Sequence, residues 1–266
     1  TDAPVIAVVD VAGDIIEGTT LSDTGSITFT DVDLTDLPLA TEVTSTVDAV
    51  LADGSTPLTL NGTQQAAIEA AFTIANVGTN TNDGSVTWDY TITEGELDFL
   101  AEGETVTAVF TITVDDQNGG TDTQDVTITI TGATDAPVIA VVDVAGDIIE
   151  GTTLSDTGSI TFTDVDLTDL PLATEVTSTV DAVLADGSTP LTLNGTQQAA
   201  IEAAFTIANV GTNTNDGSVT WDYTITEGEL DFLAEGETVT AVFTITVDDQ
   251  NGGTDTQDVT ITITGA

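Results

Sequence analysis

Residues 128–139 read ITITGATDAPVI, and this stretch contains the end of one copy of a sequence and the beginning of the next. Residues 1–133 and 134–266 are identical, so the opening TDAPVI returns at 134–139. Before the boundary, hydrophobic and polar residues alternate up to Gly132, which is the pattern of a β-strand. After it, Pro137 fixes its own φ angle and favours an extended Ala136. The stretch therefore predicts two domains, 1–133 and 134–266, joined by a short, extended and acidic connection.

The composition is strongly acidic, with 46 Asp and Glu residues and no Lys, Arg or His. Phosphate contacts need Lys and Arg, so we expect no nucleic acid and no anionic membrane surface as partner. No apolar run approaches the roughly 18 residues of a membrane-spanning helix. Cysteine is absent, so no disulfide can stabilise the fold. Because 40% of the residues are hydrophobic and they alternate regularly, we expect a folded chain.

Each repeat contains seven stretches with the alternation typical of strands, separated by turn signals. In the first repeat they lie at 5–11, 26–30, 43–51, 56–60, 86–92, 106–114 and 125–131. We expect a long acidic turn at 13–25 and an acidic crossover at 94–104, in which Leu97 and Leu100 are buried. In the third strand, we expect Val43, Val47, Ala49 and Leu51 to share one face.

The segment 61–72, NGTQQAAIEAAF, interrupts the alternation. Asn61 can cap a helix, and Gln64 can complete a reciprocal capping box. The pattern predicts an all-β fold of two tandem seven-stranded immunoglobulin- or cadherin-like β-sandwiches, each with one short inserted helix.

In such a sandwich, alternate connections lie at the same end. The N-terminus, the loop 31–36 (DVDLTD) and the loop 115–122 (DDQNGGTD) would share one pole of each repeat. The turn after the first strand, the crossover 94–104 and the C-terminal end would share the other. Many carboxylates without cationic partners would repel one another there. Acidic loops can simply be solvated, but this clustering favours bound cations.

Calcium is the predicted ion, because it accepts six to eight oxygen ligands in flexible geometry, whereas Mg²⁺ demands a strict octahedron. Zinc, copper and iron are poorly supported without His or Cys. We predict several Ca²⁺ ions per repeat, including ions at the junction between repeats. The predicted ligands are Asp2, Glu17, Asp31, Asp33, Asp98, Glu102, Asp115 and Asp116, with Asp135, Glu150, Asp164, Asp166, Asp231, Glu235, Asp248 and Asp249 as their equivalents in the second repeat.

The sequence resembles the VCBS and cadherin-like repeats of bacterial repeats-in-toxin adhesins. The resemblance rests on FTDVDLTD, GSVTWDYTI, LDFLAEGE, VFTITVDDQNGG and VTITITGATDAPV, which together cover most of the repeat. It implies extender modules of a large secreted cell-surface adhesin, exported by type I secretion and rigidified by Ca²⁺. Because no signal peptide is present, we also expect this sequence to be an excerpt of a longer chain.

The leading functional prediction is therefore a calcium-rigidified spacer that projects an adhesive tip away from the cell. Its partners would be neighbouring repeats in a monomeric rod, with no small-molecule substrate and no membrane insertion. An alternative is a Ca²⁺-dependent carbohydrate-binding module, although Trp88 and Tyr90 fall on the apolar face of their strand. Ice binding through Thr-x-Thr runs is a weaker alternative, because the runs do not look repeated in register. We expect no enzyme activity, since the usual nucleophile–base pairs are missing.

Overall fold

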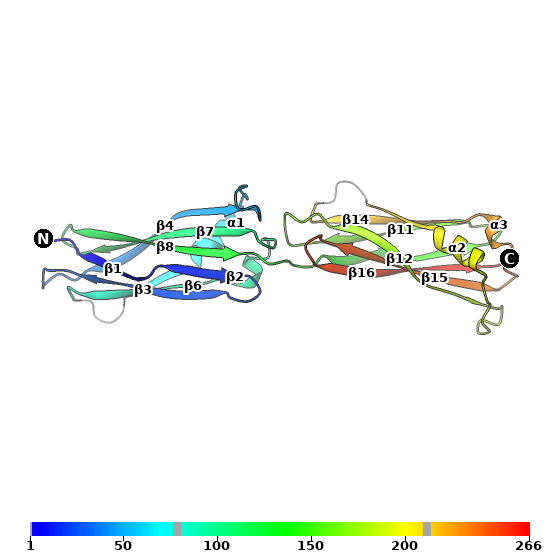
Figure 1. The fold of residues 1–266 in the computed structure, drawn as a ribbon, viewed down its shortest axis with the longest axis horizontal. Coiled ribbons are helices and arrows are strands. Elements are labelled where there is room, and N and C mark those ends of the chain that lie inside the picture. Colours follow the sequence, from blue (N-terminus) through cyan, green and yellow to red (C-terminus); the bar gives the residue numbers. More distant parts are fainter. Residues whose placement is uncertain (1, 77–80, 210–213) are drawn as a thin grey trace. The chain divides into compact units, whose positions relative to one another are not determined.

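The computed structural model describes residues 2–76, 81–209 and 214–266. It divides the chain into two compact units, Thr1–Thr134 and Asp135–Ala266 (Figure 1). The described strands of unit 1 are β1 (Val5–Asp10), β2 (Ala12–Ile16), β3 (Ser22–Thr30), β4 (Leu39–Val50), β5 (Phe72–Asn76), β6 (Gly84–Thr91), β7 (Thr105–Asp115) and β8 (Thr121–Thr131). Its helical segments are α1 (Gly62–Ala70) and the 3-10 turn η1 (Glu94–Glu96).

Unit 2 repeats this arrangement. Its strands are β9 (Val138–Asp143), β10 (Ala145–Ile149), β11 (Ser155–Thr163), β12 (Leu172–Val183), β13 (Phe205–Asn209), β14 (Gly217–Thr224), β15 (Thr238–Asp248) and β16 (Thr254–Thr264). Its helices are α2 (Gly195–Ala203) and α3 (Glu227–Leu230).

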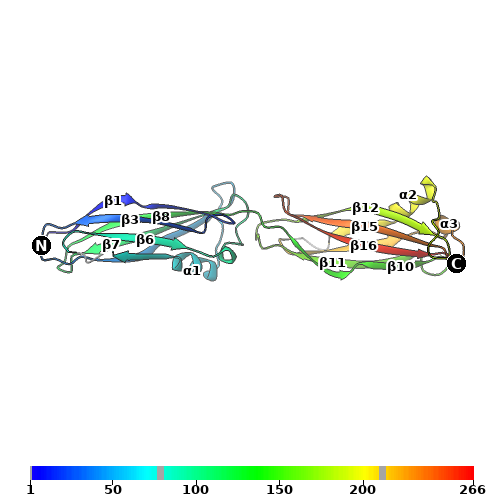
Figure 2. The same ribbon diagram turned by 90° about the horizontal axis from the view of Figure 1, so that it is seen from below.

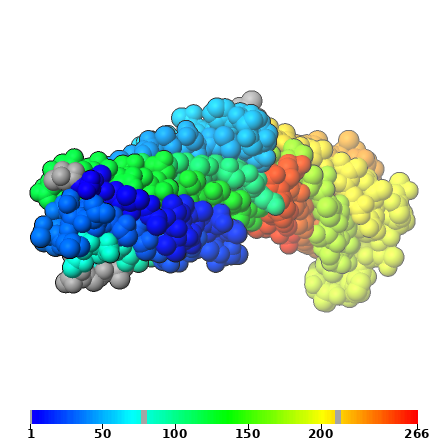
Figure 3. All heavy atoms as spheres, turned by 60° about the vertical axis from the view of Figure 1, so that its left-hand side comes forward, coloured from blue at the N-terminus to red at the C-terminus, as the bar shows by residue number. Residues whose placement is uncertain are grey.

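The strands of unit 1 form two four-stranded sheets, ordered β1-β3-β6-β5 and β2-β8-β7-β4. Only Val11 separates β1 from β2, so one edge strand passes from the first sheet to the second. There β2 pairs with β8 in parallel, and Figure 3 shows the blue N-terminal strands lying along the green C-terminal segment of this unit. Counting β1 and β2 as one strand gives seven. The predicted immunoglobulin- and cadherin-like β-sandwich with one inserted helix is confirmed.

Aromatic side chains fill the space between the sheets of unit 1. Phe72 stacks on Phe110 with ring centroids 4.2 Å apart, and Trp88 and Tyr90 are almost completely buried. The Trp88 indole N–H donates to the Asp10 carbonyl at 2.7 Å. The inward residues predicted for β7, from Val106 to Val114, are fully buried, as are Leu97 and Leu100. These expectations are confirmed.

Helix α1 begins at the predicted cap. The Asn61 side chain accepts from the Gln64 N–H at 3.0 Å, and the Gln64 side chain accepts from the Asn61 N–H at 2.8 Å. Figure 2 shows α1 toward the end of unit 1 that lies opposite the N-terminus. The helix ends before Phe72, which instead begins β5, a strand that is not among those expected from the sequence.

The prediction of a long acidic turn at 13–25 is wrong, because most of these residues belong to strands β2 and β3. Gly13 and Gly25 resemble turn residues, but both lie against the Trp88 indole. A Cβ on Gly25 would overlap the ring, and a Cβ on Gly13 would overlap the Ile128 side chain and make a tight contact with the ring. Their lack of a side chain therefore serves packing. The true turn is short and contains Gly18, whose φ of +73° suits glycine.

Two further strand predictions are corrected. Strand β4 begins at Leu39, and a register shift between Thr44 and Thr46 reverses its alternation, which leaves Val43 57% exposed while Ala49 is buried. The expected strand at 56–60 is reduced to an isolated bridge between Val50 and Pro57.

The threonine runs lie in register, contrary to the expectation from sequence. On β7 and β8, Thr105 lies opposite Thr131, and Thr107 lies opposite Thr129. Such pairs are typical of the solvent face of an antiparallel sheet. Among the described helices, none is long and apolar enough to cross a membrane.

Candidate metal centres

The loop after β3 gathers three carboxylates. Asp31, Asp33 and Asp36 each place one oxygen so that all three lie within 4.8 Å of one another, as do Asp164, Asp166 and Asp169 in unit 2. We call each set the N-terminal cluster of its unit. The Asp33 N–H donates to Asp31 Oδ1 at 2.9 Å, and the Asp36 N–H donates to the Asp33 carbonyl at 3.0 Å. These bonds fold the alternating acids of DVDLTD onto one side of the loop.

The loop between β7 and β8 meets this cluster. The Asn118 side-chain amide donates to Asp36 Oδ1 at 2.9 Å. Asp116 is fully buried, and its Oδ1 accepts the N–H groups of Asn118 and Gly120 at 2.7 and 2.9 Å. A Cβ on Gly120 would lie 2.7 Å from the Ala3 Cα, so only glycine fits there. The two loops and the N-terminal segment therefore meet at one pole.

Several predicted ligands lie beside the cluster instead of within it. Asp2 donates its backbone N–H to Asp33 Oδ2 at 2.8 Å, and Asp135 does the same to Asp166 Oδ2 at 2.8 Å. Asp115 accepts the Gln117 N–H at 2.7 Å, and Asp248 accepts the Gln250 N–H at 2.8 Å. The Asp249 carboxylate accepts the Asn251 N–H at 2.6 Å, as its equivalent does in unit 1.

Buried oxygens in these clusters test whether a cation fits. Among the described residues, Asp31 Oδ2, Asp36 Oδ2 and Asp116 Oδ2 are buried and have no hydrogen-bond partner. The same holds for Asp164 Oδ2 and Asp166 Oδ1. A buried, ionised oxygen without a partner is costly. A divalent cation bound by several such oxygens removes that cost, so the donor set fits Ca²⁺.

The pKa values in the N-terminal cluster of unit 2 reflect the same cost of burying ionised carboxylates. Burial raises the pKa of Asp166 to about 8, and the carboxylates of Asp169 and Asp164 add to the rise. Burial also raises the pKa of Asp164, although the Asp166 N–H partly offsets the effect. In unit 1, burial alone would raise the pKa of Asp116, but the N–H groups of the following turn outweigh it and lower that pKa.

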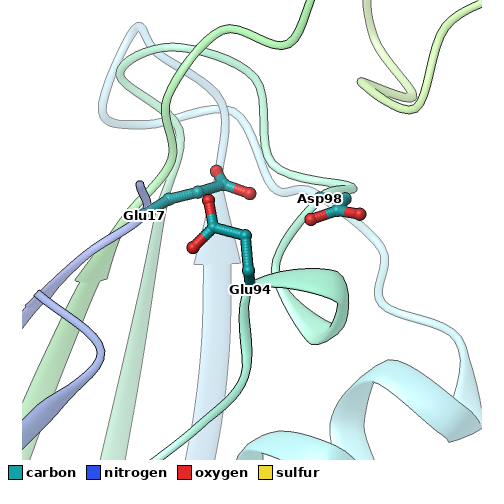
Figure 4. Close-up of side chains that lie close together, drawn as sticks. All are labelled: Glu17, Glu94 and Asp98. Atoms are coloured by element: carbon teal, nitrogen blue, oxygen red, sulfur yellow. The ribbon is translucent and has the colours of Figure 1, made fainter. Parts of the chain in front are cut away.

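A second cluster lies at the other pole. Figure 4 shows Glu17 and Glu94 pointing toward each other, with Asp98 beside them. Their ligand oxygens lie within 4.8 Å of one another, and Glu150, Glu227 and Asp231 repeat the set. We call these the C-terminal clusters. Glu17 follows β2, and it accepts the Ala133 N–H at 2.8 Å. Glu94 opens η1 and accepts the Gly18 N–H at 3.1 Å.

Glu94 and Glu227 are not among the predicted ligands, and neither are Asp36 and Asp169, although the sequence assigns the loop 31–36 to the correct pole. The usable signal is the TxxE capping box, in which Glu96 accepts the Thr93 N–H at 3.0 Å. That bond commits Glu96 to the cap and lowers its pKa, which leaves Glu94 to face Glu17. The predicted Glu102 lies outside the cluster, and its side chain accepts from the Thr134 hydroxyl at 3.4 Å. Its equivalent in unit 2, Glu235, is exposed.

The aromatic residues considered for sugar stacking are part of the core. Trp88 is 1% exposed and Tyr90 is 0% exposed. The Tyr90 hydroxyl donates to the Ile68 carbonyl at 3.2 Å. Burial raises the Tyr90 pKa above its ordinary value. Neither ring can therefore stack on a carbohydrate without unfolding the sandwich.

Comparison with known proteins gives structural similarity only. No family model and no curated protein sequence matches this chain. Titin domains Z1Z2 in complex with telethonin are 10% identical at a TM-score of 0.38, over all of this chain and 98% of that one. Extracellular cadherin domains 1–5 of protocadherin gamma B2 are 11% identical at a TM-score of 0.45, over 99% of this chain and 40% of that one. The sialic acid binding region of a Streptococcus sanguinis adhesin is 12% identical at a TM-score of 0.27, over all of this chain and 78% of that one.

Proposed function

We propose that this chain is a calcium-rigidified spacer of a secreted bacterial adhesin. The observation that carries the proposal is a set of buried carboxylate oxygens that have no hydrogen-bond partner in the described part of the chain, such as Asp31 Oδ2 in unit 1 and Asp164 Oδ2 in unit 2. The chain contains no Lys, Arg or His, so no side chain of its own can neutralise them. Protonation, which the raised pKa of Asp166 favours, is one way to neutralise them, and bound cations from solution are the other.

Each cluster can supply part of a calcium coordination shell. In unit 1, Asp31, Asp33 and Asp36 would hold an ion at one pole, and Glu17, Glu94 and Asp98 would hold one at the other. Backbone carbonyls and water complete such shells in proteins. The bound ion would neutralise the carboxylates and fix the loops that carry them.

The connection between the units would be stiffened by the same ions. The Ala133 N–H donates to Glu17 in the C-terminal cluster of unit 1. The Asp135 N–H donates to Asp166 in the N-terminal cluster of unit 2. These two N–H groups are separated by Thr134 alone. Fixing both carboxylates would therefore restrict the backbone of the connection from either side. This is the proposed origin of rigidity.

The setting proposed for this spacer is the outside of a bacterial cell. The resemblance to extender repeats of repeats-in-toxin adhesins supports that setting. Identical modules in series add reach without a catalytic site. In such a chain, low free Ca²⁺ inside the cell would leave the modules loose for export, and the higher concentration outside would order them.

Calcium titration of the two-unit chain tests the proposal. We expect Ca²⁺ to raise the melting temperature, because a ligand in hundredfold excess over its Kd stabilises the folded state by about 2.7 kcal/mol per site. Small-angle scattering should show a narrower distribution of maximum dimension in Ca²⁺ than in chelator. Asp31→Asn with Asp164→Asn should weaken both effects. The matched pair Asp48→Asn with Asp181→Asn, at exposed strand positions, should not. A melting curve that chelator leaves unchanged would exclude the calcium role.

A further inference from the structure

The loop that contacts each N-terminal cluster contains an Asn–Gly step, Asn118–Gly119 in unit 1 and Asn251–Gly252 in unit 2. In an Asn–Gly step the glycine backbone nitrogen can attack the Asn side-chain carbonyl carbon, because glycine adds no Cβ to block the approach. The new C–N bond closes a succinimide ring and the C–NH2 bond breaks, releasing ammonia. Water then opens the ring and leaves aspartate or isoaspartate. The net reaction exchanges an amide for a carboxylate and needs only water.

The folded loop holds both reacting groups away from this reaction. The Asn251 side-chain amide donates to Asp169 Oδ1 at 2.7 Å, which fixes the carbon that would be attacked. The Gly252 N–H donates to Asp249 Oδ1 at 2.9 Å, which occupies the attacking nitrogen. In unit 1 the Asn118 amide is held in the same way by Asp36. Attack therefore requires the loop to open.

Opening of the loop depends on the charge of the cluster. Asp36 and Asp116, which hold the Asn118 side chain and backbone, each keep one buried oxygen without a partner among the described residues. The ligand oxygens of Asp31, Asp33 and Asp36 lie within 4.8 Å of one another, so without a cation these three carboxylates repel one another. Local opening then costs less than it does with the charge neutralised. A cation bound at the cluster would favour the closed loop.

We propose that Asn118 and Asn251 are deamidation sites controlled by cation occupancy of the N-terminal clusters. The cation dependence rests on the proposed calcium function, whereas the reactivity of the Asn–Gly step does not. Deamidation replaces an amide that donates to Asp36 or Asp169 by a further carboxylate. The product then repels the cluster in the absence of cation and offers an additional ligand in its presence. A chain that has been depleted of Ca²⁺ would thereby become more dependent on it.

The same chain supplies an internal control. Asn61–Gly62 and Asn194–Gly195 are also Asn–Gly steps. The Asn61 side chain accepts the N–H groups of Thr63 and Gln64 at 2.9 and 3.0 Å as the cap of α1. These bonds are part of a helix end and involve no carboxylate cluster. Their deamidation should not respond to Ca²⁺ through the loop.

The test is incubation of the whole chain at mildly alkaline pH, in Ca²⁺ or in chelator, followed by peptide mass spectrometry. Trypsin cannot be used without Lys or Arg, so a protease that cleaves after aromatic residues is used. In chelator, we expect the peptides of Asn118 and Asn251 to deamidate faster than those of Asn61 and Asn194. At Ca²⁺ a hundredfold above its Kd, the open loop should be about a hundredfold less populated, and deamidation should slow accordingly. Asn118→Gln with Asn251→Gln should abolish the fast signal.

The outcomes separate this inference from the calcium proposal. If the loop peptide deamidates no faster than the cap peptide in chelator, the modification site is wrong. If Ca²⁺ raises the melting temperature but leaves the loop rate unchanged, cation control is wrong and calcium binding stands. If Ca²⁺ changes neither quantity while the loop peptide still deamidates faster, the calcium proposal fails and the modification site is supported. In the variant Asn118→Asp with Asn251→Asp, we expect a lower melting temperature in chelator and a larger rise with Ca²⁺.

Discussion

The carboxylate of Glu17 accepts the backbone N–H of Ala133 at 2.8 Å, although the two residues are 116 positions apart. Glu150 makes the same bond to Ala266 at 2.9 Å. A residue at the first turn of each unit therefore holds the backbone where that unit ends. Because Glu17 also belongs to the C-terminal cluster, one side chain combines a structural hydrogen bond with a candidate metal ligand.

These two roles of Glu17 can be separated by substitution. In Glu17→Gln with Glu150→Gln, the amide oxygen can still accept the backbone N–H, so we expect the melting temperature in chelator to stay near that of the wild type. The Ca²⁺-induced rise should shrink, because a charged ligand is lost. In Glu17→Ala with Glu150→Ala, the lost bond should cost a further 1–3 kcal/mol or so per unit in chelator. Equal Ca²⁺ responses of the wild type and the Gln pair would contradict the assignment of Glu17.

The identical units allow the role of the connection to be tested with a matched control. We expect Asp164→Ala with Asp166→Ala to broaden the scattering distribution in Ca²⁺, because Asp166 accepts the Asp135 N–H within the connection. Asp31→Ala with Asp33→Ala removes the same carboxylates from the same loop of unit 1. It should lose as much bound Ca²⁺, counted by calorimetry, without broadening the distribution. If both pairs broadened it equally, the proposed stiffening would be wrong.

Much of the fold follows from the local sequence. The alternation from Thr105 to Asp115 predicts a half-buried strand, and Asn61 with Gln64 predicts a capped helix start, because both signals depend on near neighbours. The packing of Gly25 against the Trp88 ring could not be predicted, because Trp88 lies on another strand. The reversal at Val43 depends on a bulge that leaves no signature in the composition.

The candidate sites likewise contain some residues that the local sequence predicts and others that depend on tertiary packing. Asp31 and Asp33 are predicted by the spacing of one loop, since a short turn brings alternate side chains together. Glu94 is not, because its position opposite Glu17 depends on how the crossover packs against the first turn. Likewise, the contact of Asn118 with Asp36 joins loops 82 positions apart. The sequence alone places such residues at a pole but does not select among them.

Acid sensitivity should depend in part on Asp53 and Asp186. The Asp53 side chain accepts the hydroxyl and the N–H of Thr56, and these bonds lower its pKa to about 2, as they do for Asp186. Because this value lies below the ordinary 3.8, their contribution to the free energy of unfolding is present in full above 3.8 and is lost as the pH falls toward 2.

Comparison with Asp53→Asn and Asp186→Asn isolates this contribution. The difference in melting temperature between the wild type and the double variant should shrink as the pH is lowered from about 5 to about 2. The pair Asp48→Asn with Asp181→Asn removes the same number of charges and serves as the control. A difference that does not change with pH would show that the turn is stabilised by the shape of the side chain and not by its ionisation.

The packing of Gly25 against Trp88 predicts an unusually large effect for the addition of one methyl group. A Cβ on Gly25 would overlap the indole ring, and the same holds for Gly158 and Trp221. The ring has little freedom to move away, because its N–H is bonded to the Asp10 carbonyl at 2.7 Å. We expect Gly25→Ala with Gly158→Ala to lower the free energy of unfolding by about 1–3 kcal/mol per unit in urea titrations, as overpacked cores do.

Gly62→Ala with Gly195→Ala is the matched control, because it adds the same methyl groups in open space at a helix start. Alanine is the better helix former, so the free energy of unfolding should be unchanged or should rise by up to about 1 kcal/mol. Equal losses in both pairs would show that the loss at position 25 does not come from overlap with the indole.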